Sequence, residues 1–374
     1  MTNPFPTSGY RGPSYFCDRE KEVAALMKVI KGGGNVTLFS IRRMGKTALV
    51  HHFFNTLAQD KNRLAIYLDA MPTSDLKGLT NQLATAVAQA YPESTPFGKK
   101  LWQWIKTLRP LISFDAYSGL PQLSFDVGQM EQQQSTIRNV LQFLEASGKK
   151  VVIAIDEFQQ ITRYPEKQTE AWLRSEIQSL QNVNFIFCGS QQHLLLEMFN
   201  SAKRPFYAST QMFPIHPIEV EPYAVFIAAH FKQARMEIKQ VDIRFILEWC
   251  RLHTFYVQAV CGRVYLLGER KITREAIQAV ISNLFKENLA IYFTYREMLT
   301  ESQWALLKAI AKEGRVYAPT AMGFIQRHRL GTPAAVKRSL ESLLAKEMIF
   351  RENSGAGSYL QVYDLFLSRW LETQ

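Results

Sequence analysis

The sequence predicts an α/β protein in which a parallel sheet is followed by a helical domain and a mixed C-terminal domain. In residues 14–215, short apolar runs alternate with segments of helical periodicity, which is typical of parallel strands joined by helical crossovers. The proline-rich stretch 213–217 then marks a boundary, and the pattern beyond it is mainly helical. We therefore expect an N-terminal extension over 1–13, the α/β core over 14–215, the helical domain over 216–298 and the last domain over 299–374.

The composition is that of an ordinary globular protein with an excess of positive charge. Hydrophobic residues make up 47% of the 374 residues, and the formal net charge is +11. A basic surface attracts nucleic acids, acidic proteins and nucleotides, and the charge alone does not choose among them. The sequence has no secretory signal and no apolar run of the roughly 18 residues that span a membrane, so we expect a cytoplasmic protein. Free thiols in a reducing compartment are expected for Cys17, Cys188, Cys250 and Cys261, which form no CxxC pair.

Four apolar runs predict strands, and segments with a helical pattern lie between them. The expected strands are 35–41, 64–68, 151–155 and 184–188, and the expected helices are 48–58, 76–90, 136–147 and 168–181. Residues 92–135 interrupt this alternation. Two similar runs, Leu111–Asp115 and Leu123–Val127, flank Ser118-Gly119 and predict a β-hairpin inserted into the core.

The first strand runs into a phosphate-binding pattern. The segment Ser40-Ile-Arg-Arg-Met-Gly-Lys-Thr47 matches the last three positions of GxxxxGK[ST], and Ser40 replaces its first glycine. Gly45 lets the backbone approach phosphate, Lys46 suits the β- and γ-phosphates, and the Thr47 hydroxyl suits Mg²⁺. The residues expected to contact a nucleotide are Arg42, Arg43, Met44, Gly45, Lys46, Thr47 and Ala48.

An acidic pair favours the same chemistry. The strand 151–155 ends in Asp156-Glu157, and carboxylates at this edge of a parallel sheet face the ligand crevice. Asp156 is expected to hold Mg²⁺ together with Thr47, and Glu157 to polarise the attacking water as a catalytic residue. An isolated acidic pair more often caps the helix that follows it. The phosphate loop upstream makes ATP hydrolysis the preferred interpretation.

These residues resemble the STAND ATPases, in particular their prokaryotic MNS-like group, within the AAA+-related P-loop proteins. Phe16-Cys-Asp-Arg-Glu-Lys-Glu22 is similar to the family's N-terminal element, and Phe187-Cys-Gly-Ser190 to the strand that ends in its sensor 1 residue. The resemblance implies a P-loop NTPase sheet, a helical lid domain and a C-terminal winged helix. It also implies that Arg19 lies on the adenine side of ATP, a role compatible with Asp18 as a helix cap.

The resemblance assigns two further residues to catalysis. Ser190 would sense the γ-phosphate, and Arg204 stands where AAA+ proteins often place an arginine that stabilises charge in a neighbouring subunit. Each residue also has a simpler interpretation. Ser190 would cap the helix that starts near Gln191, and Lys203-Arg204 would be an exposed basic pair.

One segment departs from the family pattern. The lid usually carries a Gly-x-Pro-Tyr turn that closes over the nucleotide, whereas this chain has Leu252-His-Thr-Phe-Tyr-Val-Gln258. Without the glycine and proline, the sequence leaves open whether this turn contacts the nucleotide. For His253, a phosphate contact is one interpretation, and a packed or surface histidine is the commoner one.

The last domain has the pattern of a winged helix. Helices are expected over Glu301–Ala311, over Pro319–Arg329 and from Pro333 onward, and the runs 348–350 and 359–362 predict a two-stranded wing. From residue 301 on, ten basic and seven acidic residues give only +3, so DNA binding and protein binding both stay open. The residues expected to face DNA are Thr332, which would also cap the third helix, Lys337 and Arg338, with Arg327 and Arg329 before them.

The sequence favours a molecular switch in which ATP or ADP selects a domain arrangement that the winged helix reports to DNA or to a protein partner. Two other functions fit the same residues. One is a DNA-binding regulator whose nucleotide site is structural or vestigial. The other is a defence-related scaffold that forms a homo-oligomer through its ATPase face.

Overall fold

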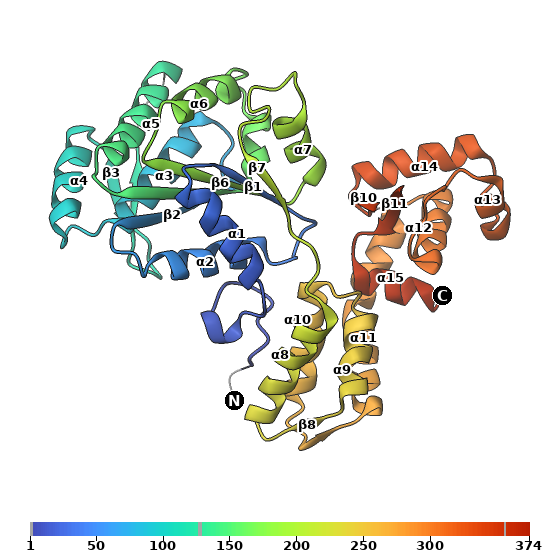
Figure 1. The fold of residues 1–374 in the computed structure, drawn as a ribbon. Helices are drawn as coiled ribbons and strands as arrows, with labels where there is room; N and C mark the ends of the chain where they lie inside the picture. Colours follow the sequence, from blue (N-terminus) through green and yellow to red (C-terminus); the bar gives the residue numbers. More distant parts are fainter. Residues whose placement is uncertain (1–2, 126–128, 355–356) are drawn as a thin grey trace. The chain divides into compact units, whose positions relative to one another are not determined.

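A computed structural model describes residues 3–125, 129–354 and 357–374, and Figure 1 shows their fold. The chain divides into two compact units, and neither is one continuous stretch. The first unit comprises residues 6–223 with the short segment 253–255, and the second comprises the residues up to Phe5 with 224–252 and 256–374. None of the helices in the described residues is long and apolar enough to cross a membrane.

The first unit is built on a parallel sheet with the strand order β2-β5-β6-β1-β7, which confirms the predicted α/β fold class. Four of its strands were expected. The fifth, β7, lies in the stretch whose prolines favoured a boundary, and proline is tolerated there because it ends an edge strand. The strands are β1 (Val36–Phe39), β2 (Arg63–Asp69), β5 (Lys150–Asp156), β6 (Val183–Gly189) and β7 (Gln211–Pro214).

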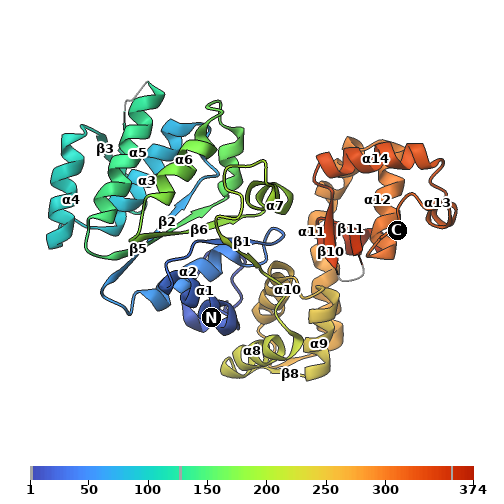
Figure 2. The same ribbon diagram turned by 45° about the horizontal axis from the view of Figure 1, so that its top comes forward.

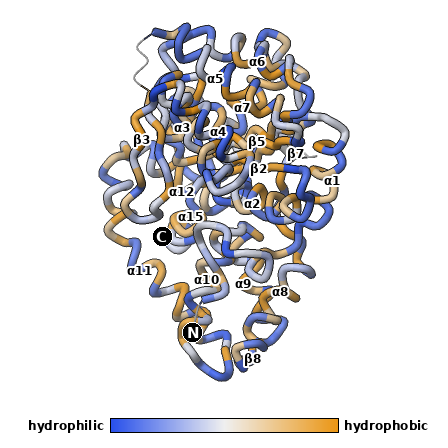
Figure 3. Tube along the Cα trace, turned by 90° about the vertical axis from the view of Figure 1, so that its left-hand side faces the viewer, coloured by the Kyte–Doolittle hydropathy of each residue, from blue (hydrophilic) through white to orange (hydrophobic). Residues whose placement is uncertain are grey.

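Helices cover both faces of this sheet (Figure 1). Side chains along each buried strand alternate between the two faces, and on each face they pack with helix residues in one apolar cluster. Val152 and Ala154 of β5 pack toward α1 and α2, whereas Ile153 and Ile155 pack toward the opposite cluster. Figure 3 shows hydrophobic stretches of the trace at the strands β2 and β5. The helices are α1 (Glu20–Lys31) and α2 (Lys46–Leu57) on one face, and α3 (Leu76–Ala90), α5 (Met130–Glu145), α6 (Thr169–Gln178) and α7 (Gln192–Asn200) on the other.

The inserted hairpin is confirmed. It follows α4 (Pro96–Thr107), which carries the exposed Lys99, and consists of β3 (Leu111–Phe114) and β4 (Pro121–Ser124). The second strand begins two residues earlier than expected, and Val127, its expected end, lies outside the described residues. Helix α5 starts at Met130 rather than Thr136, so it already includes the last residues of the segment predicted as an insertion.

The second unit begins with helices, as the pattern beyond residue 216 predicts. They are α8 (Val220–Gln233), α9 (Gln240–Trp249), α10 (Thr254–Leu266) and α11 (Arg274–Met298), with the two-residue strands β8 (Glu237–Ile238) and β9 (Lys271–Ile272). Phe5 is 1% exposed, and its ring lies against Phe226, Phe231 and Tyr265. The N-terminal segment thus contributes a core residue to this unit.

The predicted winged helix is also present (Figure 2). Thr332 caps α14 by accepting a hydrogen bond from the Ala335 amide at 3.3 Å, as expected. Helix α13 begins at Met322 rather than Pro319, and the final helix α15 was not predicted. The elements are α12 (Glu301–Glu313), α13 (Met322–His328), α14 (Pro333–Ala345), β10 (Ile349–Ser354), β11 (Gly357–Val362) and α15 (Leu365–Glu372).

Candidate functional site

The loop between β1 and α2 turns sharply before the helix. Arg43 has φ 63° and Gly45 has φ 95°, so both lie in the left-handed region, and α2 begins directly at Lys46. Glycine adopts this conformation without the steric cost that other residues carry. The first amides of a helix have no partner within it, and they attract an anion together with the helix dipole. The loop is therefore shaped to bind an anion at the N-terminus of α2.

Lys46 is buried at this helix start, with only 6% of its surface exposed. Its Nζ donates to the Ser40 carbonyl at 3.2 Å, to the Ser40 hydroxyl at 3.1 Å and to the Ile41 carbonyl at 3.2 Å. Burial lowers the pKa of Lys46, and Asp156 and Glu157 oppose this shift. Neutral oxygens replace the water shell of an ammonium only in part, so an anion in the loop would stabilise the charged form of Lys46. Ser40, which replaces the first glycine of the motif, thus provides two of the three oxygens that accept hydrogen bonds from Lys46.

Thr47 and Asp156, which the sequence assigns to one metal ion, lie in direct contact. The Thr47 hydroxyl donates to Asp156 Oδ2 at 2.5 Å, and the Tyr67 hydroxyl donates to the same oxygen at 3.0 Å. Burial raises the pKa of Tyr67, and the nearby charge of Asp156 raises it further. The Tyr67 hydroxyl therefore stays protonated and acts as the donor of this hydrogen bond. Sequence reasoning missed Tyr67, since its only signal is a place near the carboxyl end of β2, beside β5.

Glu157 follows in the left-handed region at φ 49°, and its carboxylate is held by three donors. Oε2 accepts from the Ser190 hydroxyl at 2.9 Å, from the Ser190 amide at 3.4 Å and from Gln159 Nε2 at 2.5 Å. Arg42 Nε in turn donates to the Ser190 hydroxyl at 3.2 Å. The residue proposed to polarise water and the proposed γ-phosphate sensor therefore contact each other and the phosphate loop.

The simpler helix-capping interpretations are wrong for this site. Glu157 precedes the 3-10 helix Phe158–Arg163, but its side chain caps no amide of that helix. The cap position of α7 is Gln191 rather than Ser190, and α1 has no side-chain cap from Asp18. The side chains of Glu157 and Ser190 are thus used at the carboxyl edge of the sheet.

Two predicted arginines are engaged elsewhere in the first unit. Arg19 is 4% exposed, donates to Glu22 at 2.6 Å and donates to the His216 carbonyl at 2.7 Å. Arg204 pairs with Glu170 and lies 3.3 Å from Glu197. An arginine in such pairs must leave them to reach a neighbouring subunit, so the catalytic role of Arg204 stays a prediction. The adenine-side role of Arg19 also stays a prediction.

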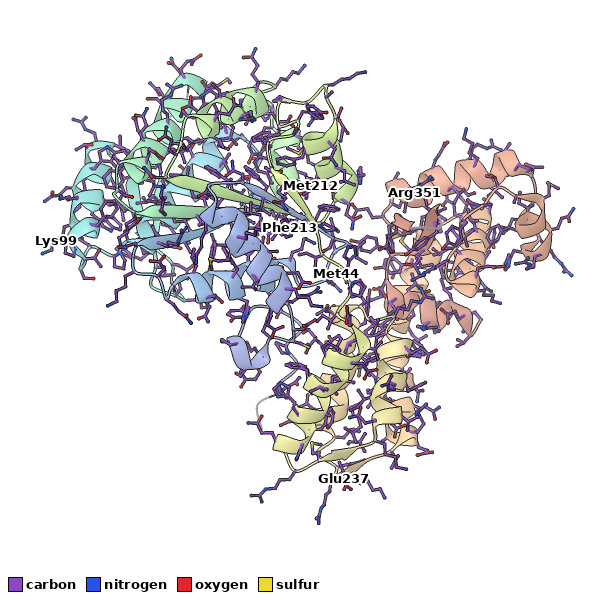
Figure 4. All side chains as sticks on the ribbon, in the orientation of Figure 1. Met44, Lys99, Met212, Phe213, Glu237 and Arg351 are labelled. Atoms are coloured by element: carbon purple, nitrogen blue, oxygen red, sulfur yellow. The ribbon has the colours of Figure 1, made fainter. Side chains whose placement is uncertain are left out.

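The turn 253–255, which lacks the family's glycine and proline, lies on the phosphate loop within the same unit. His253 Nε2 lies 3.1 Å from the Arg42 carbonyl, and the Thr254 hydroxyl donates to the Met44 carbonyl at 3.3 Å. Burial lowers the pKa of His253 to about 4, so the imidazole is neutral near pH 7 and donates its Nε2 proton to the carbonyl. His253 is thus a packed histidine that contacts the loop. Figure 4 labels Met44, the loop residue whose carbonyl accepts from Thr254.

A buried lysine at a phosphate loop, opposite a threonine–aspartate pair at the end of a parallel strand, defines a P-loop ATPase. The chain belongs to the family described as an ATPase domain predominantly from Archaea, whose model matches residues 16–250. Residues 290–373 match a probable winged helix domain. No curated protein matches the sequence.

Solved structures with low sequence identity share the fold. The Walker-type ATPase paby2304 of Pyrococcus abyssi is 17% identical, with 98% of this chain and 99% of that chain covered and a TM-score of 0.66. The Aeropyrum pernix ORC2 protein, solved as ADPNP-ADP complexes, is 12% identical, with 99% and 96% covered and a TM-score of 0.60. The Aeropyrum pernix ORC1 protein in complex with DNA is 13% identical, with 96% and 93% covered and a TM-score of 0.51.

The left-handed conformation of Gly45 generates a stability prediction. A Cβ at this position would have space, since the nearest atom is Thr254 Cγ2 at 4.0 Å, but the φ of 95° would strain it. We expect Gly45→Ala to lower the free energy of unfolding of the first unit by about 1 kcal/mol or more, measured by urea denaturation. Gly323→Ala is the control, because Gly323 lies in α13 with no positive φ and an open surrounding, so the change should be neutral or stabilising. Equal stability of the Gly45 variant and the wild type would contradict the strained conformation.

Proposed function

We propose that the chain binds ATP with Mg²⁺, hydrolyses it slowly, and uses the bound nucleotide as a switch of the STAND type. The observation that carries this proposal is the joining of Lys46, Thr47 and Asp156 at one helix N-terminus. The ADPNP-ADP complexes of the Aeropyrum pernix ORC2 protein, which shares the fold, are compatible with a nucleotide in this loop. Lys46 and the amides of the loop would bind the phosphates.

The oxygen atoms of the side chains beside the phosphate loop are suitable ligands for Mg²⁺. The Thr47 hydroxyl and the Asp156 carboxylate supply oxygens, which Mg²⁺ prefers, and they already lie 2.5 Å apart. Thr47 and Asp156 would hold the ion, and Tyr67 would orient the aspartate from behind. The ion supplies charge neutralisation on the phosphates when it is bound.

Hydrolysis would depend on how Glu157 is held. Its carboxylate accepts from Ser190 and Gln159, and these hydrogen bonds fix its orientation toward a water at the phosphate. Ser190 also accepts from Arg42 of the phosphate loop, so a phosphate that draws Arg42 away would change the partners of Ser190 and then of Glu157. Arg204 would act only on a neighbouring subunit, after leaving Glu170 and Glu197.

Two substitutions separate binding from turnover. Lys46→Ala removes the phosphate-binding cation, and we expect ATP affinity to fall by about 10- to 100-fold in calorimetric titration. Glu157→Gln should keep ATP affinity and lower turnover by about 10²–10⁴-fold. Lys99→Ala in α4 removes an exposed lysine and serves as the control, with unchanged binding. Undiminished ATP affinity in Lys46→Ala would exclude this loop as the nucleotide site.

The contact of Tyr67 with Asp156 predicts an effect on the metal. Tyr67→Phe removes one donor to Oδ2, and we expect the Mg²⁺ concentration that supports half-maximal hydrolysis to rise by about tenfold. ATP binding measured in a chelator should not change, because the phosphate loop is intact. Tyr117→Phe, at a fully exposed position, is the matched control. An unchanged Mg²⁺ dependence would remove Tyr67 from the site.

We further propose that the winged helix contacts DNA through α14. Lys337 and Arg338 are exposed on this helix, and Arg329 is exposed just before it. Arg327 pairs with Glu313, so its charge is partly neutralised. The Aeropyrum pernix ORC1 protein, which has the same fold, was solved in complex with DNA. A protein partner at this helix is the alternative outcome of the test below.

Removing two charges from α14 tests this contact. Lys337→Ala with Arg338→Ala should weaken binding to duplex DNA and reduce the dependence of log affinity on log salt by about two. Arg270→Ala with Lys271→Ala removes the same charge from exposed positions outside the winged helix. Equal losses in both double variants would indicate binding by net charge alone. A complete absence of DNA binding in the wild type would favour a protein partner.

A further inference from the structure

We infer that the turn His253–Phe255 holds the phosphate loop in its anion-binding shape and transmits the state of the loop to the winged helix through Tyr256. The second half of this inference rests on the proposed function, because it needs a nucleotide in the loop. The first half concerns the protein alone. Four consecutive residues, 253–256, carry both halves.

Three consecutive residues of the turn contact three consecutive residues of the loop. His253 bonds to the Arg42 carbonyl, Thr254 bonds to the Met44 carbonyl, and the Arg43 guanidinium lies 4.3 Å from the centre of the Phe255 ring. Two of the contacts hold backbone oxygens, and the third is a cation–π contact with the side chain between them. The turn therefore contacts the loop at residues 42, 43 and 44, and we call these three contacts the grip.

This grip determines where the loop amides point. In a planar trans peptide, the carbonyl and the N–H of the next residue point in opposite directions. Holding the Arg42 and Met44 carbonyls on the side of the turn therefore directs the Arg43 and Gly45 amides away from it. Amides that point to the same side can bind an anion together, and the left-handed Arg43 and Gly45 belong to such a turn conformation.

The contacts also account for the missing glycine and proline of the family turn. His253, Thr254 and Phe255 each make a specific side-chain contact with the loop, which a glycine or a proline at these positions could not make. Thr254 lies close to Gly45, with 4.0 Å between Thr254 Cγ2 and the position of a Cβ on that glycine. The turn thus lies within van der Waals distance of the left-handed glycine of the loop.

Tyr256 belongs to the second unit and contacts the winged helix. Its hydroxyl accepts a buried hydrogen bond of 3.0 Å from the Leu365 amide, at the start of α15, and its ring lies 4.7 Å from that of Phe366. Helix α15 follows the wing strand β11 after only two residues. Thr254 and Phe255 thus contact the phosphate loop within the first unit, and Tyr256, the next residue of the chain, contacts α15 within the second unit.

The grip is tested on the nucleotide-free protein by amide hydrogen exchange. Thr254→Val and Phe255→Leu each remove one contact with little change in volume. We expect exchange in peptides covering residues 40–47 to become about two- to tenfold faster in each variant, with β5 and β6 unchanged. Thr294→Val, at an exposed threonine of α11, is the matched control and should change nothing in the loop. Unchanged loop exchange in both variants overturns the grip, whether or not the protein binds ATP.

The transmission is tested with ATP and Mg²⁺ present. In the wild type we expect nucleotide to change the exchange of peptides covering residues 363–372, and in Tyr256→Phe we expect this change to be lost while ATP affinity stays the same. A change that persists in Tyr256→Phe overturns the transmission through Tyr256, as does a wild type that binds ATP with no change at 363–372. If the wild type binds no ATP, the proposed function fails together with the transmission, while the loop measurement still decides the grip.

Discussion

The burial of one positive charge governs the arrangement of the first unit. A lysine ammonium that is almost completely removed from water must find oxygen partners, and Lys46 finds them in Ser40 and Ile41. Those partners require the chain to curl back over the helix start, which in turn requires the left-handed Gly45. The two carboxylates that oppose the depression of the Lys46 pKa come from the end of β5. The sheet order then matters, since it brings the carboxyl ends of β1, β5 and β6 to one edge.

The same edge joins residues that are far apart in the sequence into one hydrogen-bonded set. Arg42, Ser190 and Glu157 come from three different strand-to-helix connections, and the Ser190 hydroxyl contacts both Arg42 and Glu157. Such a set has few alternative arrangements because its members are held by neighbouring backbone elements. A change at the phosphate loop can thus reach Glu157 through Ser190 without a large movement.

Much of the fold follows from local sequence, and the parts that do not have physical reasons. Buried parallel strands such as 151–155 are continuous apolar runs, and phosphate chemistry constrains Gly45, Lys46 and Thr47 so strongly that the pattern survives the change at Ser40. Strand β7 was missed because prolines are typical of loops, and only its place at the sheet edge makes them acceptable. Tyr67, the partners of Arg204 and the turn 253–255 depend on contacts between distant segments, and no local periodicity records such contacts.

The burial of Phe5 has a consequence for dividing the protein into parts. This ring fills a space between α8 and α10, yet the residues that follow it belong to the other unit. A recombinant fragment that starts after residue 215 would lack the ring, and vacating such a space typically costs about 3–5 kcal/mol of folding free energy. A fragment that ends near residue 223 would instead carry an unpacked aromatic tail and would lose its own residues 253–255. Because both units are discontinuous in the sequence, no single truncation point yields either unit with all of its residues. Measurements on such fragments would therefore report on incomplete units.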